Sequence, residues 1–486
     1  MSRFRLQAPL RAPAIAAALA ATGDIANATS GIPTTFDGLY SGFTVDTGTG
    51  AKTQGAQSVP AMSTDIMTGG YTDAAFNTKV RRITQLADAS GGSPTHMRHE
   101  YAKRSAYNAD GSLFLEQSSQ GWWFLKNAAT NAVIPNGITT GAGTNGINGL
   151  AGDCEPIWHP TDRAKLWHTA QNGASLIWYE YTVNETGSNV TGARTTLFDL
   201  TAKLSALGPP WNGVTMAWFV GEGRPSDDGR YWGLQLEHNP SSPVNDGFCL
   251  FDRQTDTILF TVATSGNRPN WTGTSNSGTY VVASWYGTAA ASIAAEQALA
   301  VSAAVGVRAY SGASTFRSIS VLGEHADLCK NAAGEDTYVA INFHGTQEGA
   351  GIGDQITVRK LSDGSIFGLP IFAFAGNTGT GFHVSGCATQ RPGWAVIGRY
   401  AGVGSGAYDG QVIAAELRAT SPRICRLAHH RSTGSPYFAE PQPTSDKWLT
   451  RVTFASDFGS GSGDIQSYTI CLPSPAAGGI PHPATT

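Results

Sequence analysis

The sequence predicts an all-β fold, a β-propeller built from four-stranded blades. The first observation is a repeated pattern in which an extended run with His, Asp or Glu is followed by a turn and then by alternating apolar residues. The second is the composition: the 486 residues include 59 Gly and 10% aromatic but only 14% charged residues, which favours strands and turns over helices. A recurring four-strand unit is how an antiparallel sheet protects its edges in a propeller.

The repeated pattern begins near residue 96 and continues almost to the end of the chain. Its copies occupy residues 96–127, 152–183, 225–263, 268–287, 324–343, 382–400 and 437–473. Because they cover most of the chain, we expect residues 62–475 to form one closed ring rather than two or three domains, followed by a C-terminal tail at 476–486. Asp110, Asp162 and Asp228 fall at inter-strand turns, where we expect their side chains to bond local backbone.

Residues 1–61 are rich in Gly, Thr, Ala and Ser. This composition predicts an extended, low-complexity N-terminal arm. Three Arg precede an apolar stretch at 12–21, which imitates a secretory signal weakly because its core is mostly Ala. We expect the arm to lie either on its own ring or on a neighbouring subunit, and the second arrangement would give a homo-oligomer. The corresponding location is extracellular or surface-associated, in a secreted protein or a virion-like assembly.

Charge and hydropathy argue against two classes of partner, nucleic acids and a membrane-spanning segment's lipid surroundings. The formal net charge is -4 and no run of Lys or Arg occurs, so we expect no nucleic-acid partner. No apolar stretch approaches the roughly 20 residues of a membrane-spanning helix.

Two of the six Cys are informative because of their spacing. His325 and Cys329 are four residues apart, as are His383 and Cys387, so each pair shares a face of a strand at the start of consecutive repeats. This register predicts a disulfide between Cys329 and Cys387. The alternative is two small buried thiols that pack the interface between blades.

Functional side chains are expected where the innermost strands begin, because those strand ends line the mouth of the central channel. The candidates are Arg98, His99, Tyr101, Asp153, Glu155, His325, His383, Arg391, Trp394, Glu440 and Gln442. Such a ring of His, carboxylate, Arg and Tyr is what proton abstraction beside a sugar carboxylate requires. For His99, His325 and His383, structural hydrogen bonding between blades is the alternative.

Several short motifs, in order, resemble bacterial β-propeller proteins related to the propeller polysaccharide lyases, the oligogalacturonate and ulvan lyases. They are TDAAFNTKVRRIT (72–84), NADG (108–111), EPIWHPTD (155–162), HADL (325–328), HVSGC (383–387), RPGW (391–394) and RLAHH (426–430). The resemblance implies about seven blades, with a strand near residues 79–83 closing the last blade as a non-sequential partner.

The resemblance also implies roles for the candidate residues in elimination at a uronate. His99 or His383 would be the base, with His325 beside them, Tyr101 the acid, and Arg98 or Arg391 the partner of the substrate carboxylate. Asp153, Glu155, Trp394 and Gln442 complete the implied substrate-binding set. The cofactor stays open: Gln442 has no neighbouring His, so His325 and His383 would supply only part of a divalent-metal site.

Two functions therefore remain. One is a secreted or surface-displayed lyase that cleaves an acidic polysaccharide. The other is a non-catalytic propeller in a cell-surface or virion-like assembly, which binds a glycan or nothing at its mouth and packs its arm on neighbouring subunits.

Overall fold

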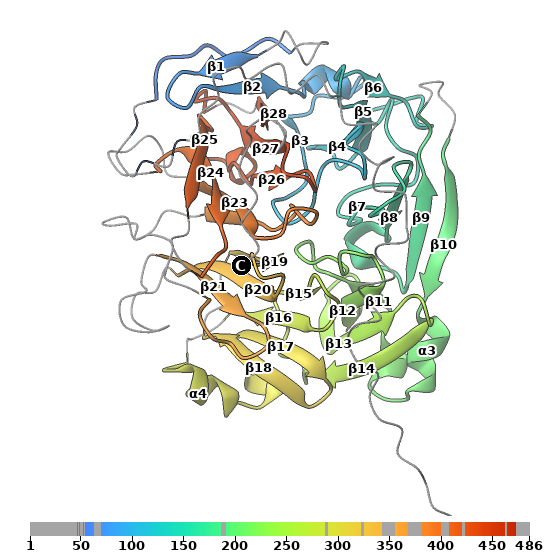
Figure 1. The fold of residues 1–486 in the computed structure, drawn as a ribbon. Helices are drawn as coiled ribbons and strands as arrows, with labels where there is room; N and C mark the ends of the chain where they lie inside the picture. The colour runs from blue at the N-terminus through green and yellow to red at the C-terminus, as the bar shows by residue number, and fades with distance from the viewer. Residues whose placement is uncertain are drawn as a thin grey trace, which may run out of the picture.

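The computed structural model describes residues 46, 48, 52, 54–62, 70–185, 191–286, 290–321, 325–342, 355–367, 382–399, 408–419, 423–461 and 464–472. The signal-like stretch at 12–21 and the tail at 476–486 lie outside these residues. In the described part, strands dominate, and α3 (Thr201–Ala206) and α4 (Ile293–Gln297) are short helices at the periphery (Figure 1). Among these residues no helix is long and apolar enough to span a membrane.

The described strands form six hydrogen-bonded sheets, arranged around a common centre (Figure 1). Five of them each use consecutive antiparallel strands. These are β7 (Ile157–Trp158), β8 (Lys165–His168), β9 (Ile177–Thr182) and β10 (Ala193–Asp199); β11 (Met216–Trp218), β12 (Tyr231–His238), β13 (Val244–Asp252) and β14 (Thr257–Ala263); β15 (Trp271–Thr274), β16 (Val281–Trp285), β17 (Gly306–Gly312) and β18 (Thr315–Ser320); β19 (Ala326–Lys330), β20 (Asp336–Asn342) and β21 (Gln355–Lys360); and β22 (Phe382–Ser385), β23 (Trp394–Arg399), β24 (Gln411–Glu416) and β25 (Ile424–His429). This arrangement confirms the predicted all-β propeller.

The sixth sheet has nine strands and joins the two ends of the chain. Its strands are β1 (Tyr71–Asp73), β2 (Thr78–Arg82), β3 (His96–Arg98), β4 (Leu113–Ser118), β5 (Trp123–Asn127), β6 (Val133–Ile134), β26 (Thr444–Ser445), β27 (Arg451–Ser456) and β28 (Ile465–Cys471). It divides at a short parallel contact between β28 and β3. Divided there, the strands make the seven groups that a ring of about seven blades requires; the blade count itself stays a prediction.

An N-terminal strand closes the ring. β2 pairs antiparallel with β28, with Val80 opposite Ile470 and Arg82 opposite Tyr468. This confirms the expectation that a strand near residues 79–83 completes the last blade. The pairing covers an edge of β28 that would otherwise expose unpaired backbone groups.

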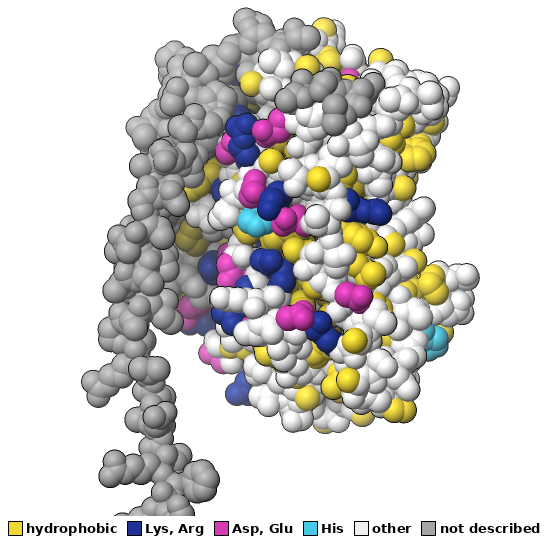
Figure 2. Space-filling model, turned by 90° about the vertical axis from the view of Figure 1, so that its right-hand side faces the viewer, with side chains coloured by type: hydrophobic (Ala, Val, Ile, Leu, Met, Phe, Trp, Pro, Cys, Tyr) yellow, Lys and Arg dark blue, Asp and Glu magenta, His cyan; other side chains and the backbone are white. Residues whose placement is uncertain are grey.

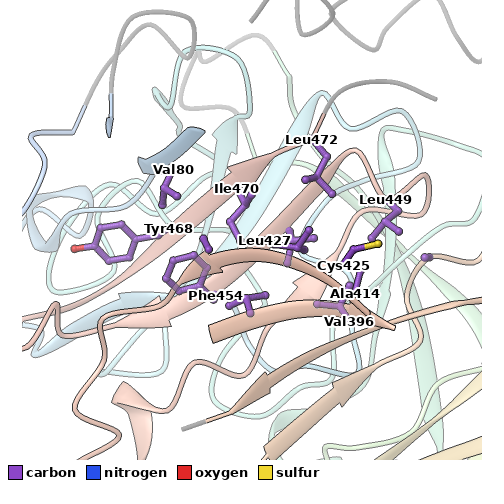
Figure 3. Packing of buried hydrophobic residues seen from close by; sticks show 14 of the residues in the cluster. Val80, Val396, Ala414, Cys425, Leu427, Leu449, Phe454, Tyr468, Ile470 and Leu472 are labelled. Atoms are coloured by element: carbon purple, nitrogen blue, oxygen red, sulfur yellow. The ribbon is translucent and has the colours of Figure 1, made fainter. Parts of the chain in front are cut away.

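The closing strands share a core with the preceding sheet. Val80 and Ile470 are fully buried and belong to one hydrophobic cluster with Val396 and Leu427 of β23 and β25 (Figure 3). A second interface, between the sheets of β7–β10 and β11–β14, is aromatic, and the rings of Trp178 and Trp232 meet at 4.8 Å. Burial of such side chains between blades supplies the main driving force for ring formation.

The turns between strands are built by local side chains, as expected. Asp110 Oδ1 accepts the backbone N–H of Ser112 (2.9 Å), and Asp162 and Asp228 accept the N–H groups two residues ahead (3.0 Å each). Gly111 follows the first of these Asp residues with a φ of 73°, a conformation that favours Gly. These Asp side chains therefore stabilise the turns of the repeated unit, as the sequence predicts.

The described residues of the N-terminal arm lie on the protein's own ring. The carbonyl oxygen of Asp46 accepts from the backbone N–H of Arg426 (2.9 Å), and that of Gly55 accepts from the guanidinium of Arg431 (2.8 Å). Packing of the arm on a neighbouring subunit stays a prediction.

On the face shown in Figure 2, Lys and Arg side chains lie among Asp and Glu side chains rather than in a patch of their own. Surface ion pairs such as Arg163–Glu185 (2.8 Å) and Lys165–Glu180 (2.9 Å) reflect this mixing. The expectation that the protein has no nucleic-acid partner stays a prediction.

Replacing Ile470 by Ala should destabilise the ring by about 2–5 kcal/mol, because it removes buried methyl groups at the closure. The measurement is the free energy of unfolding in urea. The control is Leu259→Ala on β14, where the side chain is 48% exposed and the change should stay within about 0.5 kcal/mol. Equal losses for both variants would contradict the importance of this closure.

Candidate functional site

A short segment after β3 occupies the middle of the ring. Residues 99–104 leave the strand and contact residues at or next to β11, β15 and β26. The Lys103 ammonium pairs with Glu222 (2.7 Å) and lies 4.0 Å from the ring centroid of Trp271. The carbonyl oxygen of Arg104 accepts the hydroxyl of Thr444 (2.8 Å). We call residues 99–104 the central segment.

The charged side chains of the central segment meet carboxylates from neighbouring blades. Arg104 pairs with Glu100 and donates to Glu155 (3.1 Å), which also accepts the backbone N–H groups of Phe219 (2.9 Å) and Gly221 (2.6 Å). Burial raises the pKa of Glu100 to about 8 and that of Glu155 to about 7, although Arg104 opposes both shifts. Burial also raises the pKa of Asp153. The Arg104 guanidinium is therefore shared by several buried carboxyl groups, and Glu100 and Glu155 retain part of their protons near neutral pH.

A cavity of about 270 Å³ lies beside these carboxyl groups. Its lining residues lie on or next to strands of three sheets and in the segment before β26. They are Glu100, Tyr101, Gln117, Trp123, Asp153, Val220, Gly221, Glu222 and Tyr437. The side chain of Tyr437, on the short 3₁₀ helix Tyr437–Ala439, is 53% exposed, so the cavity reaches the surface there. We call it the acidic cavity.

Two of the candidate histidines lie next to the acidic cavity. The rings of His325 and His383 stack with centroids 4.7 Å apart, and Tyr101 meets His383 edge-on at 5.1 Å. His383 Nε2 is 3.9 Å from Glu440 Oε2, and His325 Nδ1 donates to the carbonyl oxygen of Phe382 (2.8 Å). Burial lowers the pKa of both histidines, so both imidazoles are neutral near pH 7.

His99, Arg98 and Gln442 form a separate, closely bonded group. His99 is fully buried, donates through Nε2 to the carbonyl oxygen of Gln442 (2.7 Å), and has Nδ1 3.1 Å from the Ser467 hydroxyl. Arg98 donates to the carbonyl oxygens of His99 (3.0 Å) and Glu100 (2.8 Å) and to the side chain of Gln442. Burial lowers the pKa of His99 to about 3. These contacts match the structural alternative for His99, because they join the central segment to the last sheet.

The structure does not bring Arg391 and Trp394 to this place. Trp394 belongs to the hydrophobic cluster between β23–β25 and the closing strands. The titratable groups that act on Arg391 are Asp446 and Cys425, not the histidines. Of the predicted set, Tyr101, Asp153, His325 and His383 therefore lie at or next to the acidic cavity, whereas Glu155 lies in the ion-pair network beneath it.

The predicted disulfide is not present. Cys329 and Cys387 are both free, buried thiols. The Cys387 thiol points to the carbonyl oxygen of Ala102 (3.7 Å), and Cys329 packs in an aliphatic cluster with Val339 and Ile397. This arrangement corrects the prediction in favour of its alternative, two small thiols that pack the interior.

The sequence reasoning missed Glu100, Glu222 and Tyr437. Glu100 could have been found, because HEYAKR at residues 99–104 is unusually charged for a segment at the start of an inner strand. Glu222 and Tyr437 lie in loops without a repeated pattern, so nothing in the sequence marked them. In the part of the chain that the structure covers, no group of three or more His, Cys, Asp or Glu is placed to hold a metal ion, so the residues present do not fit a divalent cation.

No protein-family model matches the chain, and no curated protein sequence matches it. Its fold is similar to solved propellers. An oligogalacturonate lyase in complex with manganese superposes with a TM-score of 0.51 at 12% identity, covering 87% of this chain and 99% of its own. An oligogalacturonate lyase from Vibrio parahaemolyticus gives a TM-score of 0.47 at 13% identity, covering 83% and 96%. At 12% identity the similarity to the manganese-bound lyase concerns the fold, and it confirms a propeller that resembles oligogalacturonate lyase.

The buried carboxyl group of Glu100 should make the protein less stable as pH rises. Because the pKa of Glu100 is about 8 in the folded state and 4.5 for an ordinary Glu, the folded state binds more protons between these values. The free energy of unfolding should therefore fall from about pH 5 to about pH 8. Glu100→Gln, which is neutral throughout, should flatten this slope in urea unfolding measured across that range.

The matched control is Glu335→Gln. Hydrogen bonds from Asn331 and Lys360 lower the pKa of Glu335, so its contribution changes only below pH 4.5 and the slope above pH 5 should equal that of the wild type. A slope that survives unchanged in Glu100→Gln would show that Glu100 does not retain a proton.

Proposed function

We propose that the protein binds a hydroxyl-rich glycan in the acidic cavity at the mouth of its channel. The observation that carries this proposal is the lining itself: Glu100, Asp153 and Glu222 bring carboxyl groups to a cavity whose rim carries Tyr101 and Tyr437. Carboxyl oxygens accept hydrogen bonds from sugar hydroxyls, and tyrosine rings offer flat apolar surfaces with a polar tip.

The same lining favours a neutral sugar over an acidic one. None of the residues that line the cavity is cationic. The nearby cations are already paired, since Lys103 contacts Glu222 (2.7 Å) and Arg104 contacts Glu155 (3.1 Å). A uronate carboxylate would therefore find no free positive partner among the residues that line the cavity. The oligogalacturonate lyases of similar fold are named for a sugar-acid substrate, and their likeness supports a carbohydrate ligand in general terms only.

Tyr437→Ala should weaken binding of a neutral oligosaccharide at least about tenfold, because it removes an aromatic face worth about 1.4 kcal/mol. Isothermal titration calorimetry with neutral and uronate-containing oligosaccharides measures this. The control is Tyr286→Ala, since Tyr286 is similarly exposed (59%) and does not line the cavity. Equal affinities in both variants, or tighter binding of uronates than of neutral sugars, would contradict the proposed ligand class.

A second candidate function is β-elimination, which the contact between Tyr101 and His383 favours. A neutral His383 can accept the proton from the carbon beside a uronate carboxylate, while Tyr101, on the cavity wall, can protonate the leaving glycosidic oxygen. The C–H electron pair becomes the new C=C bond as the C–O bond breaks. None of the residues that line the cavity is a cation that could neutralise the substrate carboxylate, so β-elimination ranks second.

This candidate predicts an unsaturated product that absorbs near ~235 nm when the wild type is incubated with uronate-containing polysaccharides. His383→Gln should abolish the signal while leaving the melting temperature close to that of the wild type. The control is His168→Gln, another buried histidine, which lies on β8 away from the cavity. The absence of any absorbance change across the substrate panel would remove the lyase function and leave binding as the activity.

A further inference from the structure

The RPGW turn between β22 and β23 carries a buried cation that the proposed function does not use. Arg391 is 2% exposed. None of its three guanidinium nitrogens, Nε, Nη1 and Nη2, has a hydrogen-bond acceptor among the described residues. By contrast, Arg98 donates to several oxygens at comparable burial. A buried polar group without a partner is rare in folded proteins, and a bound ion or an ordered water is a common explanation.

Neighbouring backbone contacts hold Arg391 in place. The backbone N–H of Arg391 donates to Ala388 (2.9 Å), that of Gln390 to Lys447 (2.9 Å), and that of Gly393 to Lys330 (2.8 Å). The turn is thus attached both to the sheet of β19–β21 and to the turn after β26. Because backbone bonds fix both sides, the guanidinium does not reach solvent by a movement of the turn alone.

Two further donors occur in the same pair of turns. The indole Nε1–H of Trp394 is buried and has no acceptor in the described part of the chain, and the same holds for Trp448. Trp394 packs in one cluster with Cys425 and Leu449, and Cys425 is also an electrostatic neighbour of Arg391. The RPGW turn and the turn at residues 446–449 therefore hold several hydrogen-bond donors that have no acceptor among the described residues.

Arg391 forms no ion pair within 4.0 Å among the described residues. The carboxyl group that acts on its charge, Asp446, accepts the backbone N–H (2.7 Å) and the hydroxyl of Thr450. The described ion pairs within 4.0 Å do not include Arg391 and Asp446. Arg391 remains protonated near neutral pH because burial lowers its pKa only to about 10. An isolated buried charge of this kind is costly unless an anion or hydrogen-bond acceptor compensates it.

We propose that Arg391 binds a small monovalent anion of the halide class between the RPGW turn and the turn at residues 446–449. One positive charge matches one negative charge. The Asp446 carboxyl group acts on the same site, and it would repel a multivalent anion such as sulfate more strongly than a monovalent one. An ordered water molecule is the competing occupant, and it would leave the charge uncompensated.

Halide binding predicts an anion-specific stabilisation of the folded protein. In sodium chloride or bromide, compared with sodium gluconate at equal ionic strength, the wild-type melting temperature should rise by about 1–3 °C for each tenfold increase in halide above its Kd. Arg391→Gln should lose this dependence. The control is Arg163→Gln, whose side chain is 53% exposed and which should keep the wild-type response.

A second measurement covers the case in which Arg391→Gln does not fold. Crystals of the wild-type protein grown in bromide should show an anomalous difference peak within hydrogen-bond distance of the Arg391 guanidinium. A wild-type melting temperature that is the same in halide and gluconate, or density at this place without an anomalous signal, would mean an ordered water only and would overturn the proposal.

Discussion

The way the blades meet at the centre of the ring depends on the ion pair between Arg104 and Glu155. Glu155 is fully buried and also accepts backbone N–H groups from Phe219 and Gly221, so one carboxylate joins the central segment to two other sheets. A buried pair of this kind adds little net stability compared with an apolar contact, but loss of either partner leaves an uncompensated charge and costs several kcal/mol. Its role is therefore to specify how the blades meet at the axis.

The same interaction explains the chemistry of the acidic cavity. Arg104 is shared between Glu100 and Glu155, with Asp153 close enough to raise the pKa of both. One cation cannot compensate this many buried carboxyl groups, so the protons that remain on them reduce the electrostatic cost. A structural constraint at the axis thus produces neutral carboxyl groups at the mouth, where they can both donate and accept hydrogen bonds. Glu100 and Asp153 therefore belong both to this buried network and to the lining of the acidic cavity.

The repeated pattern allowed the propeller and the Asp turns to be predicted, because these features depend on local periodicity and turn chemistry. The closing strand, a pairing between distant parts of the chain, was predicted only from the family resemblance. The site was predictable only in part. His99 and Tyr101 are two residues apart and would share a face of a strand, yet β3 ends at Arg98 and the chain then turns into the channel. His99 therefore bonds to Gln442, whereas Tyr101 faces His383 and the cavity. Glu222 and Tyr437 come from loops whose meeting point only the closed ring determines.

Arg98 and Arg391 show why residue type alone could not decide the role of a buried cation. Both were predicted as partners of a substrate carboxylate, and both are 2% exposed. Carbonyl oxygens and Gln442 compensate Arg98, so its charge is used to hold the central segment. Arg391 has donors around it and no bound acceptor in the described residues, so its charge is available to a ligand. The two side chains are equally buried, so burial does not distinguish them. The difference is which backbone carbonyl oxygens the fold places beside each guanidinium. This distribution of acceptors separates a structural arginine from an anion-binding one.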